Sequence, residues 1–315
     1  MKPHQPAMYG GNPRRMRMKR IQLLCILESF QDFLFYKSGR RNMFEKVNPS
    51  HPDKLADRIG GAIVDLGYRL QENPKIAGEC LIGHGECHII IETSVKYDEN
   101  DIKAIVDRIA DSEVKLDLKI VPQDVYLAAN QNEEIKCGDN GIFKACAISE
   151  EEKKLAEIVK KLYSENPKDG KYIYDEMDST FIACQSNIKT EELKEKLSKY
   201  GFKKLIVNPL GDWTGGINVD TGATNRKLGS DMGRAVTGGG LHFKDISKSD
   251  VSVNVYLHKI ANEKNLKEVI CKCAIGDKNL LVNGKEISYK QVTEEALKYI
   301  KDIGGFEKLA EWGLI

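Results

Sequence analysis

The chain has 315 residues, which is long enough for two or three domains and a large buried core. Its 48 lysines and arginines nearly balance its 47 aspartates and glutamates, so it has no overall basic charge of the kind that binding to nucleic acid or an anionic membrane requires. The eight cysteines form no CxxC pair, and with 41% hydrophobic residues they indicate reduced thiols of a cytoplasmic protein rather than a disulfide framework or a zinc site.

The segment 1–42 differs in composition from the rest of the chain. It contains the basic run RRMRMKR and then the apolar stretch IQLLCILESFQDFLFYKSG, which charged residues interrupt too often for a membrane span. It also lacks the clean apolar core and the small-residue cleavage site of a secretory signal. We expect 1–42 to be an extension outside the fold or an upstream misassigned start, with an amphipathic targeting leader as the alternative.

From Met43 onward, helical and strand patterns alternate in a repeating order. HPDKLADRIGGAIVDLGYRLQ (51–71) spaces its apolar residues at helical intervals, which predicts a helix. Strands are predicted at 75–82, 86–95 and 114–121, with a helix at 101–111. The middle of the chain repeats this order less cleanly, with helices at 150–163 and 191–200 and strands at 180–187 and 203–209.

The last part of the chain gives a further copy of this order. A helix is predicted at 248–263, and another at 293–303. Between them, 268–275 and 279–289 are predicted as strands joined into a hairpin by the turn at Asn283 and Gly284. The three copies predict an α+β fold of three similar units in a pseudo-threefold arrangement, each with helices on one face of a mixed sheet. Linkers rich in glycine, asparagine and charge limit the domains to 43–131, 132–211 and 212–315, interleaved in space.

Glycine and charge are concentrated together in four stretches: NPSHPDK, CGDNG, GDWTGGINVDTGATNRK and GGGLHFKDISKSD. Glycine lets backbone amides approach an anion closely, and such amides bind phosphate oxygens. The cations that would neutralise several phosphates are Lys54, Arg226, Lys227, Lys244 and Lys248. Asp53 and Asp250 would hold magnesium, which prefers one or two carboxylates together with phosphate oxygens. These stretches predict a polyphosphate site, although neither a P-loop nor a dinucleotide-binding GxGxxG is present.

In chain order, these stretches resemble the motifs of one enzyme family, the S-adenosylmethionine synthetases or methionine adenosyltransferases. HPDKLADRI is similar to the family's His-Pro-Asp-Lys-x-Ala-Asp opening, CGDNG to its Gly-Asp-Gln-Gly loop, and KCAIG to its Tyr-Ala-Ile-Gly strand. NPLGDWTGG, DTGATNRK and GGGLHFKDISKSD match later motifs in the right order. The resemblance covers Met43 to about Gly276, describes a divergent, short member of bacterial type, and implies three similar α+β domains.

The resemblance implies that the sulfur of L-methionine attacks the 5′ carbon of ATP to form S-adenosylmethionine. The triphosphate is then hydrolysed to pyrophosphate and phosphate before release. The residue types suit this reaction, because a thioether is already a neutral nucleophile and needs no general base. The site must instead align the reacting atoms and stabilise the departing triphosphate, which cations and magnesium-binding carboxylates can do without a Ser-His-Asp triad.

The resemblance also assigns roles to single residues. His51 would contact the triphosphate near the reacting end, where its proton offsets charge on the departing oxygen. The metal ligands would be Asp53 and Asp250 for magnesium, two ions per site, and Glu79 for potassium. Methionine would contact Glu92, Gln123, Asp220, Lys248 and Ile275. ATP would contact Lys54, Asp139, Asp220, Arg226, Lys227, Lys244, Lys248 and Trp213, with Trp213 stacked on adenine.

The central part of the chain departs from the family pattern. The family has an Asp-x-Lys motif whose lysine contacts the reacting phosphate, whereas in YDEMDSTFIAC Asp175 stands in the aspartate's place and Met177 at the lysine's offset. Lys171 is interpreted as near this motif in sequence only. The missing lysine favours an alternative function, a degenerate relative that hydrolyses ATP or triphosphate; a non-catalytic nucleotide-binding oligomer is the other alternative.

His84, Glu86 and His88 alternate along a predicted strand, which would place all three on one face. Gly85 and the absence of a fourth ligand argue against a metal there, so a subunit contact or solvent is expected. The resemblance implies a dimer whose active sites are shared between the two chains, and pairing of two dimers into a tetramer stays open. The strand ECHIIIETSV fits a sheet with one face against a partner.

Overall fold

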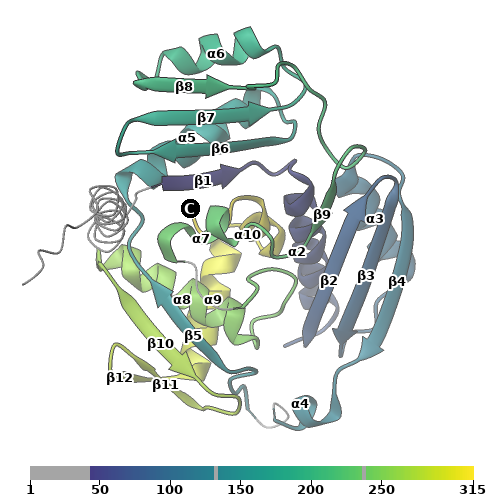
Figure 1. The fold of residues 1–315 in the computed structure, drawn as a ribbon. Coiled ribbons are helices and arrows are strands. Elements are labelled where there is room, and N and C mark those ends of the chain that lie inside the picture. Colours follow the sequence, from purple (N-terminus) through teal and green to yellow (C-terminus); the bar gives the residue numbers. More distant parts are fainter. Residues whose placement is uncertain (1–42, 131–133, 236–238) are drawn as a thin grey trace, which may run out of the picture. The chain divides into compact units, whose positions relative to one another are not determined.

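The computed structural model describes residues 43–130, 134–235 and 239–315. Residues 43–315 form one compact unit built around three four-stranded sheets (Figure 1). The predicted extension 1–42 lies outside the described residues. Within the described part of the chain, no helix combines the length and apolar character that crossing a bilayer requires.

The first sheet has the strand order β4-β3-β2-β9. Its strands are β2 (Ile76–Gly83), β3 (Glu86–Thr93), β4 (Lys115–Pro122) and β9 (Thr221–Ala223). One face packs on helices α2 (Pro52–Leu70) and α3 (Glu99–Ala110). The helix α2 begins where the sequence predicts, because His51 caps it and Pro52 occupies its first turn, where a missing N–H costs nothing.

The second sheet has the order β1-β6-β7-β8. Its strands are β1 (Met43–Val47), β6 (Gly170–Asp175), β7 (Thr180–Gln185) and β8 (Lys204–Val207). Helices α5 (Glu150–Glu165) and α6 (Thr190–Ser198) supply the apolar residues that pack on it, around Tyr172 and Phe181. Ser149 and Glu152 form a capping box that fixes the start of α5.

The third sheet has the order β12-β11-β10-β5. Its strands are β5 (Gly141–Ala145), β10 (Val269–Cys273), β11 (Asn279–Val282) and β12 (Lys285–Ser288). Helices α8 (Ser249–Glu263) and α9 (Tyr289–Asp302) pack on it. The expectation of a mixed sheet is wrong here, because all three strand pairs of this sheet are antiparallel. Asn283 and Gly284, both with positive φ, form the predicted tight turn, which joins β11 and β12.

Each sheet takes one edge strand from a distant part of the chain. Strand β1 pairs antiparallel with β6, β5 with β10, and β9 with β2. The two mixed sheets then continue in the same way, through an antiparallel partner and a parallel one reached by a crossover helix. The predicted α+β class with three similarly built units is confirmed, whereas the domain limits stay a prediction.

The remaining described elements are short: α4 (Val125–Asn130), α7 (Leu228–Met232), the 3₁₀ helix η1 (Gly233–Ala235) and α10 (Phe306–Trp312). The predicted alternation of His84, Glu86 and His88 on one strand is wrong. His84 has a φ of 52° and lies with Gly85 in the turn between β2 and β3, where a two-residue loop requires left-handed backbone. Of these three residues, only Glu86 and His88 lie on β3, where they share a face. The His88 ring lies between Glu86 and Asp117.

Candidate active site

The start of α2 carries the first pair of predicted site residues. The Nδ1 atom of His51 accepts a hydrogen bond from the backbone N–H of Asp53 at 3.2 Å, which leaves the proton of the neutral ring on Nε2. Burial and the charge of Lys227 lower the pKa of His51 to about 4. His51 is therefore a neutral ring at pH 7 whose free nitrogen is a hydrogen-bond donor.

The segment Asp220–Lys227 lies against this helix start. Gly222 packs directly on the backbone of Pro52, where any larger residue would collide. The carboxylate of Asp53 accepts the Ala223 N–H at 2.9 Å and pairs with the Lys227 ammonium at 2.6 Å. Arg226 lies 3.6 Å from the same carboxylate and is 59% exposed, so its guanidinium is open to a ligand.

A second aspartate and lysine approach the same place from the start of β6. Asp169 is buried, and its Oδ2 atom accepts the Gly216 N–H at 3.2 Å. Burial raises the pKa of Asp169 to about 6, and the negative charges of Asp220 and Asp53 add to this effect. Lys171 is close enough for its charge to contribute to the low pKa of His51.

The pair Asp169 and Lys171 has the Asp-x-Lys spacing that the sequence prediction placed at Asp175 and Met177. That prediction is not supported, because Asp175 ends β6 and Met177 is an exposed residue in the turn after it. Lys171 lies at the other end of the strand and pairs with Glu45 of β1 at 2.8 Å. The sequence signal was the motif DGK itself, which could have been found by testing every Asp-x-Lys in the central part.

Trp213 lies beside this group. The space next to Gly215 is bounded by the Trp213 ring, the Asp169 carboxylate and Ser186, and the indole N–H donates to Asn208. Trp213 also lines a cavity of 380 Å³ with Asn187 and Ile188 among its walls. An aromatic face with nearby amide groups in a cavity of this size suits a nucleobase. We refer to His51, Asp53, Asp169, Lys171, Trp213, Asp220, Arg226 and Lys227 as the helix-start group.

Other predicted residues form a second group around the beginning of α8. Gly239 has a φ of 82° and packs against the Asp250 carboxylate, which also accepts the Gly240 N–H. This close approach explains why glycine precedes the charged residues of GGGLHFKDISKSD, since a side chain at position 239 would collide with Asp250. Burial raises the pKa of Asp250, and Lys244, with its Nζ 3.9 Å from Asp250, opposes that rise.

Asp139 lies close enough to raise the pKa of Asp250 further. Its backbone carbonyl accepts hydrogen bonds from Ser249 at 3.3 Å and from the Cys137 thiol at 3.0 Å. Ile275, which is 53% exposed, is held nearby because its N–H donates to Asn140 at 2.9 Å. We refer to Asp139, Lys244, Lys248, Asp250 and Ile275 as the α8 group.

Lys248 occupies the N-cap position of α8 without a side-chain capping bond, and its ammonium has no ion-pair partner among residues 43–130, 134–235 and 239–315. Within those same ranges, no hydrogen bond or ion pair joins a side chain of the helix-start group to one of the α8 group. Most of the predicted site residues therefore fall into two separate groups.

Three predicted residues lie on or next to the first sheet. Glu79 and Glu92 are exposed on its outer face, and the hydroxyl of Thr224 donates to the Glu79 carboxylate. Gln123 directly follows β4 and is partly buried. Glu79 is thus attached to the Asp220–Lys227 segment, whereas Glu92 and Gln123 are not shown in contact with either group.

Lys54, predicted to bind phosphate, points into the interior. Its ammonium is fully buried, 2.5 Å from an Asp231 oxygen and 3.5 Å from an Asp57 oxygen. Asp57, Asp231 and His242 bring three possible metal-ligand atoms together, but Lys54 already supplies the positive charge at that place. Lys54 is missing from the exposed site because the helix turns it away from Asp53 by about 100°.

Comparisons with known proteins decide the relationship. No protein-family profile matches the chain. Curated relatives include S-adenosylmethionine synthases of Mycoplasmopsis synoviae, 25% identical over 66% of this chain and 68% of theirs, and of Mycoplasma capricolum subsp. capricolum, 27% identical over 70% and 72%. The corresponding synthase of Fusobacterium nucleatum is 28% identical over 73% of this chain and 74% of its own.

A solved structure described as an unusual S-adenosylmethionine synthetase from Campylobacter jejuni has a TM-score of 0.67 to this chain. Its sequence is 18% identical to this one, and the match covers 87% of this chain and 94% of that structure's chain. This chain is a divergent relative of the S-adenosylmethionine synthetases. The shared fold accounts for the three similarly built sheets, and the curated relatives agree with the resemblance read from HPDKLADRI to KCAIG.

Proposed function

We propose that this protein is a methionine adenosyltransferase, which joins L-methionine to the adenosyl group of ATP. The observation that carries the proposal is the convergence of His51, Asp53, Lys227, Asp169 and Lys171 from three separate segments. Lys171 supplies the cation that the family motif requires and that Met177 cannot provide. The alternative of a degenerate hydrolase loses its main support, because it rested on the absence of that lysine.

The residues of the helix-start group suit a reaction in which a triphosphate departs. His51 is neutral and donates from Nε2, so it can bond to the oxygen that gains charge as the 5′ carbon–oxygen bond breaks. Lys171 and Arg226 would bind neighbouring phosphate oxygens, and Trp213 would stack on the base. Because methionine sulfur carries a free electron pair, none of these residues has to remove a proton from it.

The carboxylates of both groups suit magnesium. Burial and like charges raise the pKa values of Asp169 and Asp250, and a nearby cation would relieve that cost. Asp53 and Asp250 would hold magnesium together with phosphate oxygens, and Glu79 would hold potassium. Bound magnesium would neutralise charge on the departing triphosphate. The cytoplasm, where ATP and methionine are available, is the proposed location.

We also propose that the two groups meet in a dimer, the helix-start group of one chain facing the α8 group of its partner. The outer face of the first sheet supports this, because Leu81 and Ile90 are 45% and 55% exposed there, beside Glu79 and Glu92. Exposed apolar residues on a sheet face are typical of a subunit contact. Sedimentation analysis should show a dimer or a tetramer, and a monomer would contradict this proposal.

The test of the function uses the full chain with ATP, magnesium and potassium, with and without L-methionine. We expect S-adenosylmethionine by mass spectrometry, with an equal amount of pyrophosphate, only when methionine is present. Release of phosphate without a sulfonium product would overturn the proposal and establish a hydrolase. Binding of nucleotide with no turnover would identify a binding protein instead.

A further inference from the structure

His242 lies in a buried network behind both groups. Its Nε2 atom is 2.8 Å from Asp231, whose other oxygen is 2.5 Å from the Lys54 ammonium. Asp57 lies on the far side, 3.5 Å from Lys54 and 3.9 Å from the His242 ring. None of these four side chains is more than 2% exposed, so the network cannot contact a ligand directly.

The network is joined through backbone bonds to the segment that carries Arg226 and Lys227. The Asp57 carboxylate accepts the N–H of Asn225 at 2.8 Å. The Asn225 side chain accepts the His242 N–H at 2.9 Å and donates to the His242 carbonyl at 3.4 Å. Asn225 therefore links the two segments, with Arg226 immediately after it on one side and His242 on the other.

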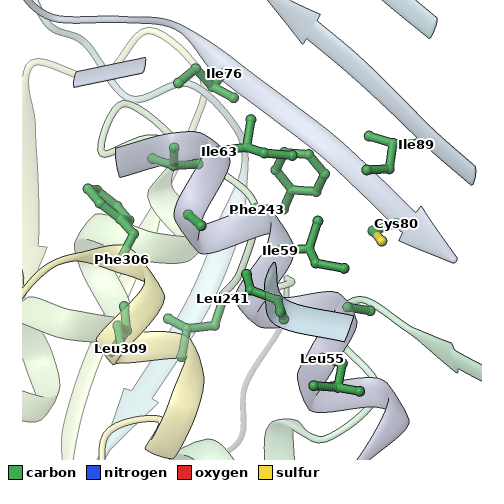
Figure 2. Packing of buried hydrophobic residues seen from close by; sticks show 14 of the residues in the cluster. Leu55, Ile59, Ile63, Ile76, Cys80, Ile89, Leu241, Phe243, Phe306 and Leu309 are labelled. Carbon is green, nitrogen blue, oxygen red and sulfur yellow. The ribbon is translucent and has the colours of Figure 1, made fainter. Parts of the chain in front are cut away.

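The backbone on both sides of this link is left-handed. Asn225 has a φ of 62°, which asparagine adopts more readily than most residues, whereas the φ of 59° at Phe243 is strained for a bulky residue. Figure 2 shows Leu241 and Phe243 packed in the core around α2, on either side of His242 in the chain. Such backbone persists only where surrounding contacts fix it, and here the next residues are Arg226 and Lys244.

Charge explains why the network suits a structural role. Burial alone would raise the pKa of Asp231, but the charges of Lys54 and His242 hold that pKa well below its usual range. Burial raises the pKa of Asp57, whose Oδ2 atom has no hydrogen-bond partner among the described residues. The Lys54 ammonium already occupies the place of a cation between the two carboxylates, so a bound metal is not needed there.

We infer that His242 is a positioning residue, which fixes Lys244 relative to Arg226 and Lys227 through Asp231 and Asn225. The inference rests on the proposed function, in which those three cations bind the phosphates of ATP. In the proposed dimer, the helix-start group and the α8 group of one chain belong to different active sites. The link through Asn225 and His242 would therefore connect these two active sites. His242 itself touches no substrate.

The experiment compares His242 with the other deeply buried histidine of the described chain, His258, which is 5% exposed in α8 and bonds to Asn262. The variants are His242→Ala, His242→Gln, His258→Ala and Asn225→Gly, which keeps the left-handed backbone but removes the link. Binding of inorganic tripolyphosphate with magnesium is measured by calorimetry on the full chain. Hydrogen exchange is followed at the backbone N–H groups of 225–227 and 242–244.

For His242→Ala and Asn225→Gly we expect tripolyphosphate affinity to fall by about tenfold to a hundredfold, and exchange to rise at both segments. His242→Gln, which can still donate to Asp231, should recover most of the affinity, and His258→Ala should change it less than about twofold. Equal losses in the two alanine variants, or unchanged exchange at 225–227 in Asn225→Gly, would overturn the inference. If the native protein fails to bind tripolyphosphate, the proposed phosphate site is wrong, and the exchange comparison alone decides whether His242 positions the segments.

Discussion

Asp53 and Lys54 are neighbours in one motif, yet they belong to different regions of the molecule. Asp53 pairs with Lys227 and lies near the exposed Arg226, where a ligand can reach the cations. Lys54 lies in the interior, bonded to Asp231 and near Asp57 and His242. The comparison teaches that a sequence motif can combine residues that act on a ligand with residues that hold the first ones in place.

The largest expected effect is on stability, from breaking the buried network. Lys54→Met leaves the Asp231 carboxylate buried without its cation, which should lower the free energy of unfolding by about 3–5 kcal/mol. Lys227→Met should cost less, because Arg226 remains near Asp53. Urea unfolding measures both. Equal losses would remove the distinction between the two regions.

The next effect is on catalysis, from the open region. Lys171→Met should lower kcat by about 10²–10³, the usual cost of removing one donor to developing charge. It should leave the unfolding midpoint nearly unchanged, because the Lys171–Glu45 pair is partly exposed. Lys204→Met, at the exposed first position of β8 in the same sheet, is the control and should keep full activity. A fully active Lys171→Met would show that the phosphate cation lies elsewhere.

A third effect distinguishes the open region from the buried network, because the free energy of unfolding should depend on pH with opposite sign in the two. Burial raises the pKa of Asp169 to about 6, so the folded protein keeps a proton that the unfolded chain loses near pH 4. The retained proton on Asp169 stabilises the folded protein below pH 4, and this stabilisation is lost as the pH rises through 6. Relative to Asp169→Asn, the native free energy of unfolding should fall by up to roughly 3 kcal/mol between pH 4 and 7.

The buried carboxylate Asp231 should behave in the opposite way. Its pKa is lowered in the folded protein, so its contribution is present above about pH 4 and decreases as the pH falls further. Urea unfolding of native protein, Asp169→Asn and Asp231→Asn between pH 3 and 7 tests both signs. The same slope in both comparisons would contradict the assignment of the two environments.

The smallest expected effect comes from removing residues 1–42. All predicted site residues lie in 43–315, which forms a compact unit, so the shortened chain should keep kcat/KM within about twofold. Activity measured on both chains tests this prediction. A large loss would mean that the extension contributes to the enzyme or to its assembly.

The sequence predicted the long elements of the fold correctly, because their patterns are local. The apolar spacing of α2 and the Asn283–Gly284 turn needed no information from distant residues. Strands β1, β5, β6 and β9 were missed. Three of them, β1, β5 and β9, are short and find their partners elsewhere in the chain. A short strand cannot be recognised from its own residues when only pairing stabilises it.

Some of the residues predicted for the site lie together in the structure, and their roles stay proposals. The motif order brought His51, Asp53, Arg226 and Lys227 together as residue types, and the structure places them side by side. Lys171 was missed because the motif was sought at the end of β6 rather than at its beginning. The burial of Lys54 could not be read from sequence, since a lysine in a charged motif has the same local pattern whether it points inward or outward.

The exchanged edge strands also bear on how the chain folds. None of the three sheets can be completed from one contiguous stretch, because β1, β5 and β9 must each reach a sheet formed by later or earlier residues. Contacts between such distant residues slow folding, because the entropy of closing the intervening chain is lost before the contacts stabilise the sheet. The three parts should therefore unfold in a single cooperative transition, and a proteolytic fragment containing only one of them should lack a complete sheet.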